Sequence, residues 1–336
     1  MTPPERAGQL LMVGLQRGGS GSALAAQARA QHLGGVVLLG GWDTGAGAVA
    51  NATATLQRGA RVKLLVAADQ EGGQVQQLRG PGFARIPSAR TQATLGTAAE
   101  EKAARGWAAQ LKAAGVDVNL APVADTVPTS LGAANAPIGR YQRDFALGSP
   151  ATNARYAAAF VRGTRAAGVA PTLKHFPGLG RVTGNTDVTS TGTTDPTTTA
   201  TDPYLAPFAA GIRAGAPLVM VSSARYPRID PDNRAMFSKS VLTDLLRGRL
   251  GFTGVVITDD VGVAKAVAAV PVGERATRFI EAGGDIVLTA SASQAPVMLA
   301  AIAAKRASSK AFAAQVDAAA VRVLDLKSDL GLAHCG

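Results

Sequence analysis

The 336-residue chain has little cysteine, little histidine and few aromatic residues, and these shortages exclude several kinds of site. Its one cysteine, Cys335, cannot form a disulfide within the chain, so cysteine usage does not identify a redox compartment. The three histidines (His32, His175 and His334) stand at unrelated positions, without an HExxH pattern or paired cysteines. The sequence therefore predicts no metal site and no cofactor.

Other features are absent as well. No apolar run reaches the roughly 18 residues that a membrane span requires. Residues 1–20 lack the basic start and apolar core of a signal peptide. We favour a secreted or envelope location with a signal removed, and a cytoplasmic location stays open. The net charge is +11, but the cations are scattered, which indicates a solvated basic surface rather than a nucleic-acid site.

Short apolar runs recur along the chain, each bounded by Gly, Pro or Asp. They are continuous rather than alternating, which is typical of parallel strands covered on both faces. The eight runs are residues 9–15, 35–39, 64–69, 116–123, 169–175, 218–222, 254–259 and 285–289.

Helix-like stretches with apolar residues three and four apart separate most of these runs, among them residues 99–114, 150–167, 238–250 and 273–282. Ser238 is a candidate N-cap, and Gly251 ends that helix. Eight strands that alternate with helices predict an α/β fold, a (β/α)8 TIM barrel, with a doubly wound open sheet as the alternative. We expect one catalytic domain over residues 1–336, with an extra C-terminal helix at 309–330.

The stretch 169–187 marks the rim of a site. An apolar run ends in Lys174 and His175, and Pro177 and Gly178 then turn the chain. The following segment, 183–202, is rich in Thr, Ser, Gly and Asp and cannot pack a core. Because loops after barrel strands form the catalytic face, we interpret residues 183–202 as an active-site loop within the barrel.

Polar residues follow several of the predicted strands. A barrel brings such strand ends around one mouth. Carboxylates together with Lys, Arg and His suit a hydroxyl-rich ligand such as a sugar, whereas no glycine-rich phosphate loop and no GxSxG elbow occur. The residues are Asp69, Asn119, Asp125, Arg143, Lys174, His175, Ser222, Ser223, Asp259 and Asp260, of which Asp260 could be only a cap.

Several motifs, taken in order, resemble family 3 glycoside hydrolases, in particular the single-barrel bacterial β-N-acetylhexosaminidases that trim N-acetylglucosamine from cell-wall fragments. The pair KHFPG and TDD at this separation is specific, and the resemblance runs from about Pro4 to Leu332. The motifs are DQEGG (69–73), NLAPVAD (119–125), RDF (143–145), KHFPGLG (174–180) and GFTGVVITDD (251–260).

The resemblance implies a retaining mechanism with a covalent glycosyl-enzyme intermediate. Asp259 would be the nucleophile, and Asp69, Arg143, Lys174 and His175 would bind sugar hydroxyls. It also implies a carbohydrate partner containing N-acetylglucosamine, and we expect a monomer that binds no nucleic acid.

The chain departs from the family pattern at four positions. The family branch carries an Asp-x-His motif after KHFPG, in which His is the acid/base, and here the matching residues are Asp187 and Thr189. Thr cannot take that role, because its hydroxyl does not titrate near neutral pH. Leu179 and Ser223 stand where many relatives have His, and Gln77 replaces a sugar-binding Arg.

Three hypotheses follow. The first is an active glycosidase whose acid/base is Asp187 or another carboxylate of the loop, such as Asp195. The second is a catalytically weak or inactive relative that binds sugar. The third is an active enzyme with another substrate, such as a β-glucoside, or with a transglycosidase reaction.

Overall fold

The computed structural model describes residues 1–333, so His334 and Cys335 lie outside the described residues. Its centre is an eight-stranded sheet in which neighbouring strands are parallel, in the order β11-β8-β7-β6-β3-β2-β1-β12. The strands are β1 (Leu11–Gln16), β2 (Gly35–Leu39), β3 (Leu65–Ala68), β6 (Val118–Asn119), β7 (Ala170–Phe176), β8 (Leu218–Val221), β11 (Val255–Thr258) and β12 (Val287–Thr289).

The sheet closes on itself. Its two end strands meet where Ile257 bridges Ile286, and the Thr258 amide donates to the Ile286 carbonyl at 2.9 Å. The predicted (β/α)8 barrel is therefore confirmed, and the open doubly wound alternative is wrong. Each predicted apolar run overlaps one barrel strand, and only β1 and β7 extend beyond their runs, by one residue each. The runs are continuous because these strands are buried on both faces.

The run predicted at 116–123 shortens to the two residues of β6. Pro122 has no N–H to donate, so the regular ladder ends before it. Two short hairpins lie outside the barrel sheet, and one of them follows β3 directly. They pair β4 (Gln70–Gly72) with β5 (Val75–Gln76), and β9 (Arg225–Tyr226) with β10 (Asp230–Arg234).

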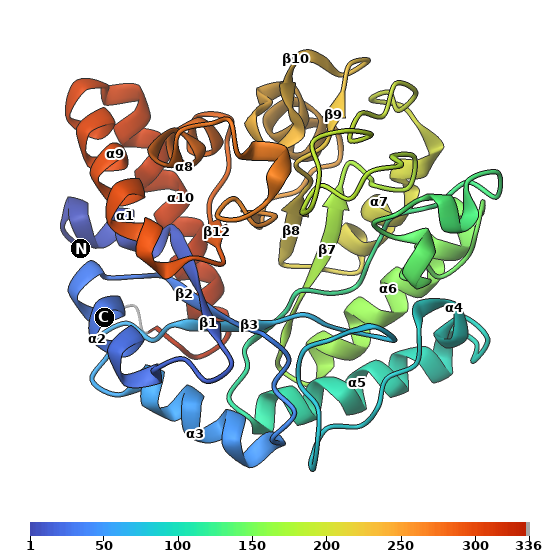
Figure 1. Cartoon of the computed structure of the whole chain (residues 1–336), viewed down its shortest axis with the longest axis horizontal. Coiled ribbons are helices and arrows are strands. Elements are labelled where there is room, and N and C mark those ends of the chain that lie inside the picture. Colours follow the sequence, from blue (N-terminus) through green and yellow to red (C-terminus); the bar gives the residue numbers. More distant parts are fainter. Residues whose placement is uncertain (334–336) are drawn as a thin grey trace.

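Helices form the periphery around the strands (Figure 1). The α-helices are α1 (Pro3–Gln9), α2 (Gly21–Gln31), α3 (Ala46–Gln57), α4 (Ala89–Gln92), α5 (Thr97–Ala113), α6 (Pro150–Ala166), α7 (Ala206–Arg213), α8 (Val272–Glu281), α9 (Ala295–Ser308) and α10 (Lys310–Asp329). Short helical turns are η1 (Gly132–Ala134), η2 (Gly139–Tyr141), η3 (Pro203–Leu205), η4 (Ala235–Phe237), η6 (Lys265–Val267) and η7 (Ala292–Gln294), and η5 (Ser240–Arg249) is a π-helix.

The helix predicted at 238–250 is thus η5, and it starts two residues later than expected. Ser238 still acts as a cap, because its Oγ accepts the Val241 amide at 3.2 Å. The wide turn is seen where the Leu250 amide donates to the Leu245 carbonyl, five residues back. Periodicity alone does not separate this winding from an α-helix.

The predicted C-terminal helix is α10, capped by the Ser309 side chain. It packs against residues that precede barrel strands. Arg322 donates to Asp285, just before β12, and the fully buried Lys327 donates to the Gln9 side chain, just before β1, at 2.6 Å. Burial lowers the pKa of Lys327 to about 7, partly offset by Asp117. The helix therefore covers the barrel end opposite to the carboxyl ends of the strands.

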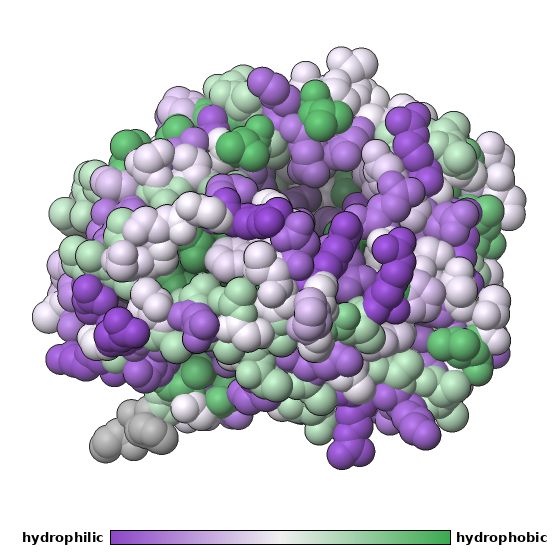
Figure 2. All heavy atoms as spheres, turned by 60° about the horizontal axis from the view of Figure 1, so that its bottom comes forward, coloured by the Kyte–Doolittle hydropathy of each residue, from purple (hydrophilic) through white to green (hydrophobic). Residues whose placement is uncertain are grey.

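No helix within residues 1–333 combines the length and apolarity needed to cross a membrane. The face of the molecule in Figure 2 is hollowed near its centre, and strongly hydrophilic residues border the hollow.

Lys327 makes the stability of the protein depend on pH. Its pKa is 10.5 when unfolded and about 7 when folded, so between these values the unfolded state binds more protons. The contribution of Lys327 to the free energy of unfolding should rise with pH by up to about 1.4 kcal/mol per unit between about pH 7 and pH 9. Lys327→Met should remove this rise, which denaturant titrations at both pH values measure. The exposed Lys310→Met on the same helix is the control, and equal slopes in wild type and Lys327→Met would contradict the assignment.

Candidate active site

A cavity of about 410 Å³ opens at the carboxyl ends of the barrel strands. This volume lies in the range of small-molecule sites. All six residues predicted for the site line it, although they come from five different segments of the chain. They are Asp69, Arg143, Lys174, His175, Asp187 and Asp259.

The strands position these side chains directly. Asp69 follows β3, Lys174 and His175 lie within the last residues of β7, and Asp259 follows β11. Arg143 comes from the loop after β6, and Asp187 comes from the loop after β7. The convergence follows from parallel strands, whose carboxyl ends all face one side of a barrel.

Two cations lie deep in the cavity and share one carboxylate. Glu71 receives two hydrogen bonds from Arg143, at 2.8 Å from Nε and 2.7 Å from Nη2, and its Oε1 lies 2.6 Å from Lys174 Nζ. Lys174 also pairs with Asp69. Burial alone would raise the pKa of Glu71, but Arg143 and Lys174 lower it to about 2. Glu71 is therefore ionised and fixes both cations.

Glu71 was not predicted as a site residue from the sequence. It lies in the DQEGG motif, two residues after Asp69, and its side chain is only 7% exposed. Glu is rarely buried without a partner, and the signal available in the sequence was a second carboxylate only two residues after the predicted site residue Asp69.

His175 is held by Asp125, a second residue whose function at the site was not predicted. Asp125 Oδ1 accepts hydrogen bonds from the His175 and Leu179 amides at 3.1 and 2.8 Å, and Asp125 Oδ2 lies 2.8 Å from His175 Nδ1. Arg143 Nη2 lies 3.4 Å from His175 Nε2. Since a guanidinium only donates, Nε2 is the acceptor and the ring proton sits on Nδ1.

Electrostatics keep this imidazole neutral. Burial and the nearby cations Arg143 and Lys174 lower the pKa of His175 well below its ordinary value. Burial raises the pKa of Asp125 to about 7, against the lowering effect of its two backbone donors. The pair thus acts as an oriented hydrogen-bonding group rather than as a third cation of the cavity.

Asp259 and Asp187 interact through their charges. Burial, and next the charge of Asp187, raise the pKa of Asp259, while the Asp260 amide and Lys174 act in the opposite direction. Asp187 is exposed to solvent, yet the surrounding protein and the carboxylates of Asp260 and Asp69 raise its pKa. Two carboxyl groups that interact in this way titrate as a pair and can hold one proton between them.

Asp260 organises the loop around this pair. Its side chain accepts the amides of Gly262, Val263 and Ala290 at 2.8 to 3.1 Å. Its expected role as a capping residue fits these contacts, although it lines the cavity as well.

Backbone hydrogen bonds join the two ends of the first part of the loop 183–202, residues 183–192. The amides of Thr183 and Gly184 donate to the Gly192 carbonyl at 3.0 and 2.8 Å. Within this part, the Asp187 carbonyl accepts the Lys265 amide at 3.1 Å, and the Thr186 carbonyl accepts the Ala266 amide at 3.0 Å. Asp187 is therefore attached to the loop that carries Asp259.

Asp195 does not lie at the cavity. It is 1% exposed and accepts four hydrogen bonds from the amides and hydroxyls of Thr197 and Thr198. The suggestion of Asp195 as an alternative acid/base is therefore wrong, because its carboxylate is used within its own turn. Thr189 and Ser223 also do not line the cavity, whereas Leu179 and Gln77 do.

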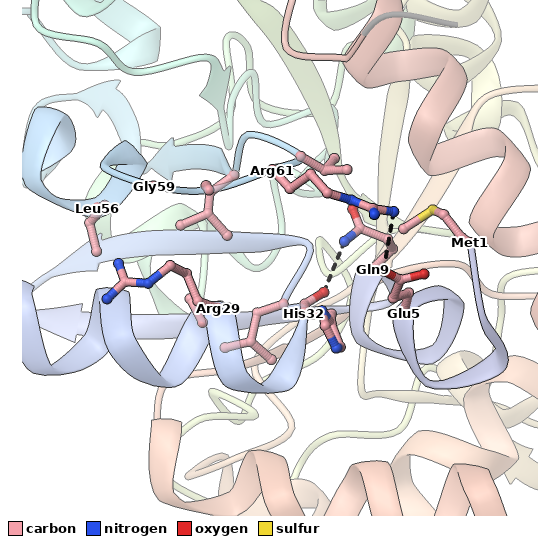
Figure 3. Close-up of a pocket in the computed structure, with 13 residues that line it drawn as sticks. Met1, Glu5, Gln9, Arg29, His32, Leu56, Gly59 and Arg61 are labelled. Carbon is pink, nitrogen blue, oxygen red and sulfur yellow. Dashed lines mark hydrogen bonds and ion pairs between the residues drawn. The ribbon is translucent and has the colours of Figure 1, made fainter. Parts of the chain in front are cut away.

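No group of three or more metal-ligating side chains occurs within residues 1–333. A smaller cavity of about 190 Å³ lies at α1 and the end of α2 (Figure 3). There Gln9 donates to the His32 carbonyl at 2.8 Å, and Arg61 pairs with Glu5 at 3.2 Å. It has one carboxylate and no second acid facing it, so its chemistry is not that of the strand-end cavity.

Comparisons with known proteins agree with this architecture. Residues 3–326 match the family described as glycosyl hydrolase family 3 N terminal domain. The chain is 36% identical over 299 residues to a beta-hexosaminidase of Stenotrophomonas maltophilia, covering 83% of this chain and 82% of that protein. It is 47% identical to a beta-N-acetylhexosaminidase of Beutenbergia cavernae of known crystal structure, with a TM-score of 0.92, covering 98% of this chain and 99% of that chain.

A family match over nearly the whole chain, together with a closed barrel whose strand ends converge on one polar cavity, identifies this chain as a member of glycosyl hydrolase family 3.

Proposed function

We propose that the protein is a retaining glycoside hydrolase that removes terminal β-linked N-acetylglucosamine, or a related N-acetylhexosamine, from a saccharide. The observation that carries this proposal is that Asp259 and Asp187 line one cavity with Lys174, Arg143 and His175. The names of its relatives, beta-hexosaminidase and beta-N-acetylhexosaminidase, support the same activity.

The reaction uses the two carboxyl groups in different roles. Asp259 attacks the anomeric carbon, the bond to the leaving oxygen breaks, and Asp187 donates a proton to that oxygen. In the second step Asp187 accepts a proton from water, and the water oxygen displaces Asp259 from the anomeric carbon. The enzyme returns to its starting state.

The charge coupling of the pair suits these roles. One carboxyl group has to be ionised and the other protonated before the first step, and two interacting carboxyl groups satisfy this with one shared proton. Lys174 favours the ionised form of Asp259. The exposed Asp187 is then the member that carries the proton to the leaving group.

The remaining residues position the sugar. Lys174 and Arg143 donate to hydroxyl oxygens and Asp69 accepts from hydroxyl hydrogens, while His175 lines the same cavity beside them. Glu71 holds both cations in place, which leaves fewer side-chain conformations to be lost on binding.

Residues 1–336 then form one catalytic domain in which loop 183–202 borders the site. Cell-wall fragments or chitin-type saccharides are the proposed substrates, a monomer is the proposed state, and no nucleic acid takes part. A sugar-binding protein with weak or no catalysis, a β-glucosidase and a transglycosidase remain the alternatives. Hydrolysis of an aryl β-N-acetylglucosaminide against the matching aryl β-glucoside separates them, because the binding protein hydrolyses neither and is still stabilised by N-acetylglucosamine.

Asp259→Asn should remove nearly all turnover of an aryl β-N-acetylglucosaminide, since a neutral amide cannot form the glycosyl-enzyme ester. Asp232→Asn, an exposed site outside the cavity, should leave the rate unchanged. Steady-state kinetics on purified variants measures both. Substantial turnover by Asp259→Asn would show that another group is the nucleophile.

Asp187→Ala should slow an unactivated disaccharide by about 10² to 10⁴-fold, the usual value of general acid catalysis. An aryl substrate whose leaving group needs no proton should form the intermediate at nearly the normal rate, and azide should accelerate its breakdown. Comparing the two substrates with and without azide measures this. Equal slowing of both, without azide rescue, would assign the acid to another residue.

Lys265→Pro should reduce kcat on the unactivated substrate more than on the activated one, because it removes the amide that holds the Asp187 carbonyl. Lys265 is the first residue of η6, and Ala264 before it is extended (φ −59°, ψ 125°), so proline fits the backbone there. Lys265→Ala keeps the amide and is the matched control. If the two variants behave alike, the backbone contact does not position Asp187.

A further inference from the structure

Two arginines face each other across the hairpin of β9 and β10. Arg225 and Arg234 are directly paired residues of this antiparallel ladder, and beside them the Ala235 amide donates to the Ala224 carbonyl at 2.9 Å. Side chains of directly opposed residues lie on one face of a ladder, and like charges in such a pair are destabilising. The pairing therefore includes a repulsion that a bound anion would remove.

The loop 183–202 extends this pair to a row of three residues. Thr194 bridges Arg225 on the side away from β10. There the Arg225 amide donates to the Thr193 carbonyl at 3.0 Å, and the Asp195 amide donates to the Arg225 carbonyl at 2.9 Å. Residues paired in neighbouring strands share a face, so the exposed Thr194 side chain stands beside that of Arg225. We call Thr194, Arg225 and Arg234 the arginine row.

Neither arginine forms an ion pair with a carboxylate within residues 1–333. Arg225 Nη1 donates to the Asp232 backbone carbonyl at 3.1 Å. Arg234 Nη1 donates to the Ser223 carbonyl at 2.8 Å and to the Thr193 hydroxyl at 3.4 Å. Within the same residues, the Nε and Nη2 groups of both side chains have no acceptor. Since a guanidinium carries five N–H donors, most donors of the row are available to a ligand.

A comparable cation elsewhere in the chain has a carboxylate that compensates its charge. Arg247 is half-buried, as Arg225 and Arg234 are, and Asp285 opposes the effect of burial on its pKa. At Arg234, burial and next the charge of Arg225 both lower the pKa, and no carboxylate opposes them. The arginine row therefore holds two positive charges without the anion that balances such charges at Arg247.

The arginine row lies outside the candidate active site but at the same end of the barrel. None of its residues lines the cavity of about 410 Å³. The loop 183–202 follows β7, and β9 follows β8, which is the neighbour of β7 in the sheet. Loops after strands lie at the carboxyl ends of a barrel. A ligand at the row would therefore lie beside the loop that borders the cavity.

We propose that Thr194, Arg225 and Arg234 form an oxyanion site that binds a phosphate, sulfate or carboxylate group. A guanidinium presents its N–H donors in a fixed fork that matches the oxygens of these groups, and the threonine hydroxyl adds one more donor. The group can be a free ion in solution or a substituent of a saccharide whose terminal sugar occupies the cavity. The second source rests on the proposed function, whereas the site itself does not.

Calorimetric titration of the whole chain with inorganic phosphate, at constant ionic strength in chloride, measures the site. Arg225→Gln and Arg234→Gln keep a neutral donor for the carbonyl contacts and remove one charge each. Each should weaken phosphate binding by about 10- to 100-fold, as the loss of a charge-assisted hydrogen bond predicts. Arg213→Gln, at an exposed residue of α7, is the matched control and should bind phosphate like the wild type.

Thr194→Val is a third variant, which changes an exposed residue and no charge. It should weaken phosphate binding by about two- to tenfold, the effect of one neutral hydrogen bond. Two results would overturn the site. One is wild type that binds phosphate no better than chloride. The other is equal phosphate affinity in the wild type and all three variants, which would place the ion at Lys174 and Arg143 of the cavity instead.

Kinetics then distinguishes the two sources. The substrates are a β-N-acetylglucosaminide whose leaving saccharide carries a carboxylate and the same compound with that carboxylate reduced to an alcohol. An anion carried by the substrate predicts that Arg225→Gln lowers kcat/KM on the acidic compound alone and that phosphate competes with this compound. A free ion predicts equal effects on both compounds. If the wild type hydrolyses neither, the proposed function is wrong, and the phosphate titration still decides whether the site exists.

Discussion

The charge balance around Glu71 is the constraint on which the candidate site depends. Lys174 is 2% exposed, and so low an exposure is unfavourable for a cation unless carboxylates surround it. Glu71 bonds both Lys174 and Arg143, and Asp69 bonds Lys174 from the other side. Because these groups come from β7 and from the segments that follow β3 and β6, the ion cluster forms only when these three neighbouring strands are paired.

The cluster also sets the properties of its neighbours. Arg143 contacts His175, and the two cations together with burial keep that imidazole neutral. Lys174 lowers the pKa of Asp259 while burial and Asp187 raise it, so the nucleophile proposed here sits between opposing influences. A site with fixed cations, one neutral imidazole and two coupled carboxyl groups can bind hydroxyls and exchange a single proton without a metal ligand set in the described residues.

Much of the fold could be predicted from the sequence, because buried parallel strands leave continuous apolar runs and helices leave spaced ones. The β2 run, residues 35–39, matches its strand at both ends. The predicted ends of two elements were wrong. The strand β6 ends before Pro122, and the helix η5 starts later than predicted and is wound as a π-helix. Strand ends likewise predicted that Asp69, Lys174, His175 and Asp259 would meet. Glu71 was missed as a site residue, the function of Asp125 was not predicted, and Asp195 was misjudged, because the partners of a carboxylate are far away in the sequence or hidden in a turn.

The central claim is that Asp259 becomes covalently bonded to the sugar. The most direct measurement uses an N-acetylglucosaminyl fluoride with fluorine at C5, which forms the intermediate faster than the intermediate breaks down. Protease digestion and mass spectrometry should find the sugar on the peptide that contains Asp259, and a competing N-acetylglucosaminide should protect it. Attachment of the sugar to another residue, or turnover with inversion at C1 and no adduct, would contradict the account.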